Sequence, residues 1–327
     1  MRVLLVSNQR QSVQGVGNPI MYRMRDALNL DKRIERADFI PFCNSVSSLK
    51  AIREQAKWAD VVHVHFGGLY ALIVWIALIG IPAKKMITFH GTDIHAKAMK
   101  TAKGCKEKFK IRLNQIASFL CIALFDASGF VAEEMYDYVP KCLSGRLKER
   151  GFVQRLGVSY ELFQPMPRCE AIKLLGLTPQ KKYALFSDVS HTTIKRRDIA
   201  KAIVDELRND YALLIMCGVK PQEVPVYLNA CDFLLLTSDE EGSPNIIREA
   251  LALNKPVFSV QVGDAAKQLK GLRNSSIISR SPKKAAETIA QVLSNKYVDN
   301  TRATLMKTLD FVSVNRVVVD KYMTLLQ

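Results

Sequence analysis

Two glutamates eight positions apart, Glu241 and Glu249, are the residues of this sequence best suited to chemistry. They lie in the segment DEEGSPNIIREALALNKPV, directly after the apolar run FLLLTS. Gly242 permits a tight turn, Ser243 is a natural helix N-cap, and Pro244 suits the first helical position. The segment therefore predicts a helix that begins at the carboxyl end of a strand and carries both carboxylates near its start.

A helix start of this kind favours an anionic ligand. Its first turn exposes backbone N–H groups that no helical carbonyl can pair with, and the helix dipole is positive there. We therefore expect Ser243, Pro244 and Asn245 to surround a diphosphate. The carboxylates of Glu241 and Glu249 suit sugar and ribose hydroxyls, which donate to them.

The pattern E-G-S-P-N-x-x-x-E-A, followed by K-P-V, resembles the E-x7-E donor-site motif of glycosyltransferase family 4. The resemblance implies that Glu241 contacts the donor sugar and Glu249 holds the ribose. It also implies that backbone amides of residues 243–245 touch the diphosphate. The alternative is a helix whose two glutamates are only solvated.

A basic cluster stands at the start of another expected helix, in SDVSHTTIKRRDIAKAIV. Cations at a helix N-terminus are unfavourable unless an anion compensates. Lys195 and Arg196 resemble the basic pair that binds the donor diphosphate in the family, although the commoner G-R-x-x-x-x-K-G form is altered here. We predict that they neutralise the leaving nucleoside diphosphate, with Arg197 as second choice; a surface basic patch is the alternative.

In the N-terminal half, the strand pattern KMITFHGTDI ends in a second polar group. It resembles the H-G-x-D segment that the family places at the donor-sugar edge of its cleft. The resemblance implies that His90 binds a sugar hydroxyl and that Asp93 belongs to the donor site. A capped loop, in which Thr92 or Asp93 starts the next helix, is the alternative.

The segment QSVQGVGNPI places Gly15 and Gly17 before a helix that should begin near Asn18, so backbone can approach a ligand closely. The family uses this loop near the acceptor and the diphosphate, so Gly17 and Asn18 are predicted donor-site residues. The third glycine of the dinucleotide fingerprint is missing, which disfavours a nicotinamide-dependent dehydrogenase.

Metal sites find no support in the sequence. None of its seventeen aspartates forms a D-x-D pair. His63 and His65 alternate on the expected strand DVVHVHFGG and share a face, but no Cys or third His stands near them in sequence. We read one of the two as a core residue and the other as lining at the strand end. No metal or cofactor is expected, so the basic residues and the helix end must supply the positive charge.

The length of 327 residues favours two domains. Short apolar runs alternate with helical patterns, which indicates α/β domains with parallel sheets, and the rhythm restarts after QPMP. We predict an N-terminal acceptor-side domain over residues 1–160 and a donor domain over 161–310. A final helix over 311–327 should return to the first domain. The family resemblance implies the GT-B fold, with two Rossmann-like domains facing a central cleft.

The net charge of +16 is uneven. Residues 1–160 carry 24 Lys and Arg against 13 Asp and Glu, and residues 161–327 carry 23 against 18. The stretch AKAMKTAKGCKEKFKIR alone holds seven cations and one glutamate. It could be a solvated helical face, or it could meet an anionic membrane or a phosphate-rich acceptor. Nucleic acid is disfavoured, because no RNA-binding, helix-turn-helix or zinc-finger pattern accompanies the charge.

The expected compartment is the cytoplasm, with peripheral binding to the cytoplasmic face of a membrane left open. The seven cysteines are odd in number, form no C-x-x-C pair and indicate a reducing compartment. MRVLLVSNQR predicts a first strand and no signal peptide. LYALIVWIALIGIP is shorter than a spanning helix and predicts a buried one.

Together, the resemblance implies a retaining glycosyltransferase that takes a sugar from a nucleotide-sugar donor, UDP-linked in preference to GDP-linked. The acceptor would be a hydroxyl on a lipid-linked or growing glycan, in surface polysaccharide or lipopolysaccharide assembly. Two alternatives stay open. One is a nucleotide-sugar 2-epimerase, which shares the fold, and the other is a basic glycan- or nucleic-acid-binding protein with a decayed donor site.

Overall fold

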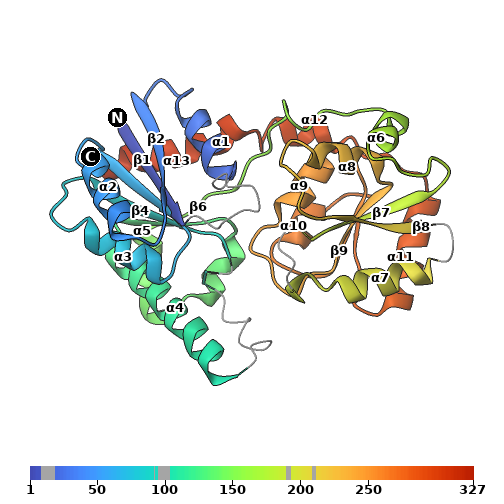
Figure 1. Cartoon of the computed structure of the whole chain (residues 1–327), viewed down its shortest axis with the longest axis horizontal. Helices are drawn as coiled ribbons and strands as arrows, with labels where there is room; N and C mark the ends of the chain where they lie inside the picture. The colour runs from blue at the N-terminus through green and yellow to red at the C-terminus, as the bar shows by residue number, and fades with distance from the viewer. Residues whose placement is uncertain (9–18, 92, 95–103, 189–192, 208–210) are drawn as a thin grey trace. The chain divides into compact units, whose positions relative to one another are not determined.

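The computed structural model describes residues 1–8, 19–91, 93–94, 104–188, 193–207 and 211–327. They form two compact α/β units (Figure 1). The first unit comprises Met1–Gly157 and Phe311–Gln327, and the second comprises Val158–Asp310. The sequence set this boundary at residue 160 and assigned the last segment to a returning helix.

The first unit is built on a six-stranded parallel sheet with the order β2-β1-β3-β4-β5-β6. Its strands are β1 (Arg2–Asn8), β2 (Arg36–Phe42), β3 (Val61–His65), β4 (Lys84–Phe89), β5 (Ala127–Phe130) and β6 (Gly151–Val153). Central strands such as β3 are buried along their whole length, as expected for a parallel sheet with helices on both faces.

Helices cover the two faces of this sheet. They are α1 (Pro19–Leu28), α2 (Val46–Ala56), α3 (Leu69–Ala77), α4 (Cys105–Leu124), α5 (Ser144–Arg150) and α13 (Phe311–Leu326). One core cluster joins the sheet to α1 and α13, and another joins its opposite face to α2, α3 and α4. The C-terminal helix α13 therefore completes the core of the first unit.

The second unit has a five-stranded parallel sheet with the order β11-β10-β9-β7-β8. Its strands are β7 (Lys182–Ser187), β8 (Tyr211–Met216), β9 (Phe233–Leu236), β10 (Val257–Ser259) and β11 (Ser276–Ile277). Its helices are α6 (Arg168–Leu174), α7 (Arg197–Glu206), α8 (Val224–Ala230), α9 (Asn245–Leu251), α10 (Ala265–Leu269), α11 (Pro282–Ser294) and α12 (Thr301–Met306). The predicted fold class, two parallel-sheet α/β domains, is confirmed.

Helix α3 differs from the prediction of a buried helix. Only Tyr70, Ala71 and Val74 are buried within it, whereas Ile73 is 42% exposed and Ile76 is 55% exposed. The reason is geometric, because a helix on an outer layer turns only one face toward the sheet whatever its composition. Its apolar outer face is therefore presented to solvent.

The structure also bears on the long apolar run and on the cysteines. Over the described residues, no helix combines the length and the apolar character that crossing a bilayer requires. All seven cysteines are free, and four of them are exposed.

Candidate functional site

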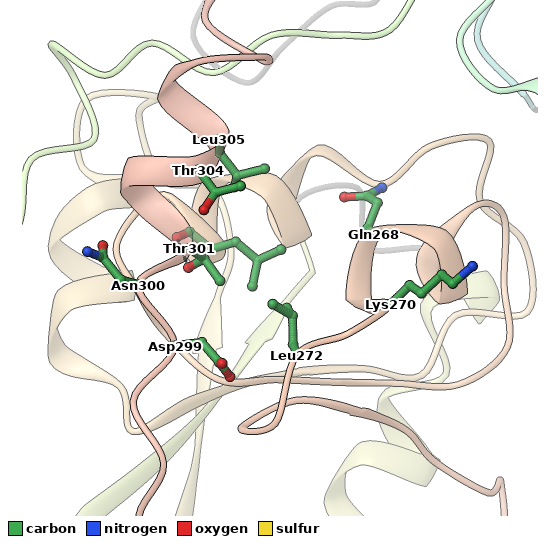
Figure 2. A pocket seen from close by; sticks show the side chains of 9 residues that line it. Gln268, Lys270, Leu272, Asp299, Asn300, Thr301, Thr304 and Leu305 are labelled. Carbon is green, nitrogen blue, oxygen red and sulfur yellow. Dashed lines mark hydrogen bonds between the residues drawn. The ribbon is translucent and has the colours of Figure 1, made fainter.

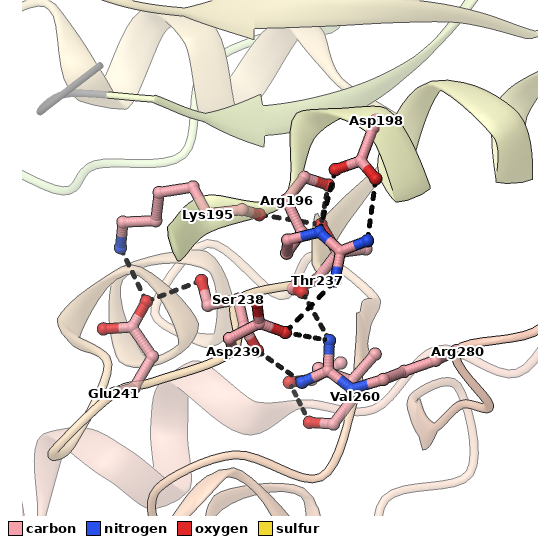
Figure 3. Close-up of polar contacts among 10 residues, drawn as sticks. Lys195, Arg196, Asp198, Thr237, Ser238, Asp239, Glu241, Val260 and Arg280 are labelled. Atoms are coloured by element: carbon pink, nitrogen blue, oxygen red, sulfur yellow. Dashed lines mark hydrogen bonds and ion pairs between the residues drawn. The ribbon is translucent and has the colours of Figure 1, made fainter. Parts of the chain in front are cut away.

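A lysine–glutamate pair stands at the carboxyl ends of two adjacent strands of the second unit (Figure 3). After β7, a short 3-10 turn, Thr193–Lys195, leads to α7; after β9, a loop carries Glu241 toward α9. Lys195 Nζ lies 2.6 Å from Glu241 Oε1, and the Ser238 hydroxyl donates to the same oxygen at 2.8 Å. The two side chains are 22% and 16% exposed, so the pair is half-buried and open to solvent.

Beside this pair, two arginines share one carboxylate. Asp239 Oδ1 lies 2.8 Å from Arg280 Nη1 and 3.5 Å from Arg196 Nη1. Arg196 also binds Asp198 at 2.8 Å, and its hydrogen bond lowers the pKa of that carboxyl. Figure 3 shows the whole group gathered around the loop that follows β9. The site thus concentrates three cations, each held by a carboxylate that a ligand could replace.

Hydrogen bonds from the end of β9 hold the backbone of residues 194–196. The Thr237 hydroxyl lies 3.0 Å from the carbonyl oxygens of both Lys195 and Arg196, and Asp239 N–H donates to Ile194 O at 2.8 Å. Arg280 donates to the carbonyls of Thr237 and Ser238 at 3.1 and 2.8 Å. These bonds hold the cations in place without using up all of their donors.

Arg196 is the N-cap of α7 and adopts a left-handed conformation, with φ 53° and ψ 53°. For a residue with a Cβ this conformation costs roughly 1 kcal/mol. Lys195 ends the 3-10 turn and Arg197 is the first residue of α7. Backbone strain of this kind collects at functional sites, where the surrounding contacts over-determine the geometry.

The start of α9 differs from the prediction. Pro244, and not Ser243, is the N-cap, and the helix begins at Asn245 and spans only seven residues. The Ser243 hydroxyl instead donates to Asp264 Oδ2 at 2.7 Å and accepts from Arg248 Nη1 at 2.7 Å. Prediction of Ser243 as the cap is therefore wrong, because a buried guanidinium competes for its oxygen.

Arg248 lies between the two motif glutamates in sequence and was not singled out from it. Its guanidinium is almost fully buried and also donates to Ser243 O and to Asn245 Oδ1. Glu249, the next residue, is half-buried on α9. Its predicted contact with a ribose stays a prediction, as does the role of Pro244, which is buried at the helix start.

One glycine outside the motif shapes this turn. Gly263 follows β10 in a left-handed conformation, φ 50°, and a Cβ there would lie 2.5 Å from Gly242 O. Any other residue would push the loop after β10 away from the turn that carries Glu241.

In the first unit, Asp93 organises the loop after β4. Its carboxylate accepts from the backbone N–H groups of Gly67 at 2.8 Å, His90 at 3.0 Å and Gly91 at 2.7 Å. Burial raises the pKa of this carboxyl, while those hydrogen bonds oppose the rise. The Asp93 carboxylate therefore stabilises this loop through its bonds to backbone N–H groups. Its predicted part in the donor site stays a prediction.

His90 is held on two sides. Its Nε2 lies 3.1 Å from His65 Nδ1, and its ring stacks on Phe66 with centroids 4.1 Å apart. Phe66 itself has a left-handed φ of 70°, an unusual conformation for a bulky residue. The half-buried His90 ring is therefore oriented by its neighbours; its predicted contact with a sugar hydroxyl is untested.

Behind His65 runs a buried hydrogen-bonded chain. Thr88 Oγ1 donates to Gln154 Oε1 at 2.6 Å, so its oxygen accepts from His63 Nε2–H at 2.8 Å. His63 Nδ1 then accepts from the Tyr322 hydroxyl of α13 at 2.7 Å. Burial, the largest cause, holds the pKa of His63 well below its ordinary value, so the ring is neutral.

Both histidines of β3 are fully buried, which corrects the reading of one of them as strand-end lining. Their rings do share a face, with centroids 4.1 Å apart. Burial likewise lowers the pKa of His65. Helix α13, which joins the first unit from the far end of the sequence, covers this face and could not be placed there from the local pattern.

Gly17 and Asn18, together with Gly15, lie outside the described residues, as does Thr92. Sequence reasoning missed Arg280, Asp239 and Thr237. Arg280 follows β11, a strand of only two residues, so its strand-end position had no pattern to reveal it. Thr237 and Asp239 follow β9, where the strand-end rule itself was the available signal.

A separate hollow of about 300 Å³ lies in the second unit beside α10 and α12 (Figure 2). Its polar lining is engaged with the chain: Asp299 accepts from Arg273 and Asn274 N–H groups, and Thr301 donates to Leu251 O. None of the predicted site residues lines it. Within the described parts of the chain, no cluster of three or more His, Cys, Asp or Glu side chains is arranged to hold a metal ion.

Two parallel-sheet α/β units, with polar clusters at their strand ends, define the class: the chain has the GT-B fold. Sucrose-phosphate synthase from Thermosynechococcus elongatus shares it, with a TM-score of 0.78 at 12% identity over 99% of this chain and 98% of that one. Anabaena HepE, solved with UDP and glucose, gives 0.73 at 14% identity, covering 98% and 99%.

Residues 192–295 match the family model of glycosyl transferases group 1, so the second unit carries a domain of that family. Among curated proteins, the chain is similar to TuaC of Bacillus subtilis, a glycosyltransferase assigned to teichuronic acid biosynthesis. The two are 25% identical over 265 residues, which is 74% of this chain and 64% of TuaC. The matched segment contains Lys195, Glu241 and Glu249, and it agrees with the expected likeness to group 1 glycosyltransferases.

Proposed function

We propose that this protein is a retaining glycosyltransferase that moves a sugar from a nucleotide-sugar donor to a hydroxyl of a lipid-linked or growing glycan. The observation that carries the proposal is the half-buried pair of Lys195 and Glu241 at the ends of β7 and β9, with Arg196 and Arg280 beside it. This is a cation-rich site with a carboxylate, inside a glycosyl transferases group 1 domain.

The ion pair suggests how the donor is bound. A diphosphate oxygen replaces Glu241 as the partner of Lys195 Nζ, and the released carboxylate accepts from a hydroxyl of the donor sugar. Ser238, which already donates to Glu241, keeps that carboxylate in position. Because the pair is partly open to water, exchanging one partner for another costs little free energy.

In the proposed reaction the bond between the anomeric carbon and the diphosphate oxygen breaks, and its electron pair stays on the diphosphate. The acceptor oxygen attacks from the same face, which retains the configuration, and its proton passes to the departing phosphate. The chain's part is to stabilise the charge on the leaving group with Lys195 and Arg196 and to hold the reactants in place. Glu249 holds the ribose, and His90, on the first unit, binds a sugar hydroxyl.

Three cations in the site support chemistry without a resident metal, since Lys195, Arg196 and Arg280 can supply the positive charge that a diphosphate needs. HepE binds UDP and glucose, which supports a UDP-linked donor for this fold. The TuaC assignment supports surface polysaccharide biosynthesis, although the similarity spans 64% of TuaC. The proposed location is the cytoplasm, at its membrane face where the acceptor is lipid-linked.

The donor site is tested by thermal unfolding with UDP, GDP and CDP, each with and without EDTA. We expect UDP to raise the melting temperature equally in both conditions. Glu249→Ala should weaken the UDP effect, and Glu287→Ala, an exposed glutamate on α11, should not. If none of the three diphosphates stabilises the protein, the donor site is refuted and a glycan-binding protein becomes the better reading.

Retention and the epimerase alternative are tested by proton NMR of the sugar. Incubation of UDP-glucose or UDP-N-acetylglucosamine with an acceptor glycan should give a product with the anomeric configuration of the donor. Inversion would contradict the mechanism. Conversion of the donor to its 2-epimer without any acceptor would identify an epimerase instead.

A further inference from the structure

Helix α4 of the first unit presents an apolar row to solvent. Phe109 is 70% exposed, and Leu113, Ile116, Leu120 and Leu124 are between 37% and 46% exposed. Their spacing of three or four residues puts them along one side of the helix, over a length of about 22 Å. The opposite side buries Ser118, Cys121 and Ile122. A surface helix normally turns polar residues outward, so this row is unexplained by folding.

The neighbouring helix shows the same feature. Helix α3 packs against α4, and Leu69 N–H at its start donates to Asn114 Oδ1 of α4. Ile73 and Ile76 of α3, and Ile79 just after it, are 42%, 55% and 54% exposed. Eight of the seventeen bulky apolar side chains exposed among the described residues therefore lie on this pair of helices or, for Ile79, directly after α3. Gathered apolar exposure of this kind marks an interaction surface.

Cations border the α4 row on both sides. Helical geometry places Lys106 and Arg112 on opposite flanks of the line through Phe109 and Leu113, with Lys108 and Lys110 farther round. All four of these side chains are exposed, and Glu107, the acid among them, lies on the far side. The first turns of α4 are exposed all round and extend beyond the sheet (Figure 1).

We propose that this α3–α4 face docks on an anionic phospholipid bilayer, with the apolar row of α4 entering the headgroup region and Lys106 and Arg112 binding lipid phosphates. Long cationic side chains suit this arrangement, because their stems lie along apolar surface while their charges reach the headgroups. The face would bring the enzyme to the membrane whatever its donor sugar.

Charge favours lipid over a second copy of the chain. In a two-fold dimer centred on Phe109 the first turns of α4 would meet themselves, so Lys106, Lys110 and Arg112 of both copies would approach one another. Like charges brought together in this way oppose association. An anionic headgroup layer instead neutralises these cations and receives the apolar side chains in one surface.

The experiment is co-sedimentation with vesicles of phosphatidylcholine alone or mixed three to one with phosphatidylglycerol. We expect the protein to bind the mixed vesicles, and Phe109→Gln with Leu113→Gln to lower its partition coefficient by about tenfold. Leu30→Gln with Leu174→Gln, two residues of similar exposure elsewhere, is the matched control and should bind like the unchanged protein. Lys106→Gln with Arg112→Gln should lower the partition coefficient by about tenfold or more for the mixed vesicles.

Equal binding of the row variant and the control would overturn the proposal. So would a dimer in analytical ultracentrifugation that the row variant dissociates, since the row would then be a contact between copies. Stabilisation by UDP is measured on every variant. A row variant that is still stabilised by UDP but no longer binds vesicles supports the membrane face. The UDP measurement thus tells a loss of vesicle binding apart from a failure of the donor site.

Discussion

The polar clusters at the two sheets' strand ends are built in opposite ways. In the first unit, His63, His65 and Thr88 are fully buried. His63 forms hydrogen bonds with Thr88 and Tyr322, and His65 forms one with His90. In the second, Lys195, Arg196 and Arg280 form ion pairs, and these three cationic side chains are 22% to 39% exposed. A buried network holds one arrangement because each lost bond is costly, whereas a half-exposed ion pair can change partners. The first cluster is suited to positioning His90, and the second is suited to binding.

The largest expected effect comes from breaking the buried cluster. His63→Ala removes the partner of both Tyr322 and Thr88 and leaves a cavity, so we expect the free energy of unfolding to fall by about 3 to 5 kcal/mol. Urea denaturation measures it, with Lys201→Ala as a control that loses only an exposed ion pair on α7. A loss below about 1 kcal/mol would show that the network does not stabilise the first unit.

Removing one cation of the second cluster should lower the rate of sugar transfer and leave the free energy of unfolding nearly unchanged. Lys195→Ala should lower kcat/KM for sugar transfer by about 100-fold, or about 2.7 kcal/mol, because the departing diphosphate loses its nearest cation. The free energy of unfolding should change by less than about 1 kcal/mol. Steady-state kinetics and urea denaturation on the same sample separate the two. Unchanged transfer with lost stability would reverse the roles assigned to the clusters.

Acid should weaken the first cluster. Burial holds the pKa of His63 and His65 well below the ordinary value of 6.5, so the unfolded chain takes up protons that the folded chain does not. Stability is then complete above that value and falls as the pH drops below it. Between pH 7.5 and 5.5 we expect a loss of up to about 2.7 kcal/mol from the two rings together.

Denaturation curves at both pH values measure this effect. The Asp93 carboxyl, whose pKa is raised by burial, can offset part of it. His63→Gln removes one of the two rings and should flatten the dependence. A slope unchanged by that substitution would assign the acid sensitivity to other groups.

The smallest effect concerns backbone strain at the second cluster. Arg196→Gly relieves the left-handed conformation at φ 53° and removes only partly exposed ion pairs. We expect stability to rise or hold within about 1 kcal/mol, while affinity for UDP falls. Calorimetric titration with UDP and thermal unfolding test both halves. A clear loss of stability would show that Arg196 supports the fold.

The sequence by itself determined the fold class and the likeness to group 1 glycosyltransferases. Strand–helix alternation requires parallel sheets, and the strand, glycine and helix signals around Glu241 and Glu249 are local in the chain. Local patterns also marked Lys195 and Arg196, because cations at a helix N-terminus are unfavourable unless an anion compensates. Those inferences need only residues close together in sequence.

Tertiary structure decided what each polar group binds. Ser243 does not cap α9, because its hydroxyl bonds Asp264 and Arg248 instead. Arg280, which is 41 residues after Asp239 in the sequence, forms an ion pair with it. His63 is buried because α13, more than 240 residues away, covers it and supplies Tyr322. The exposed apolar side chains of α3 were likewise hidden in a run that predicts burial. Composition sets how apolar a helix is, but only packing against the rest of the unit sets which face is covered.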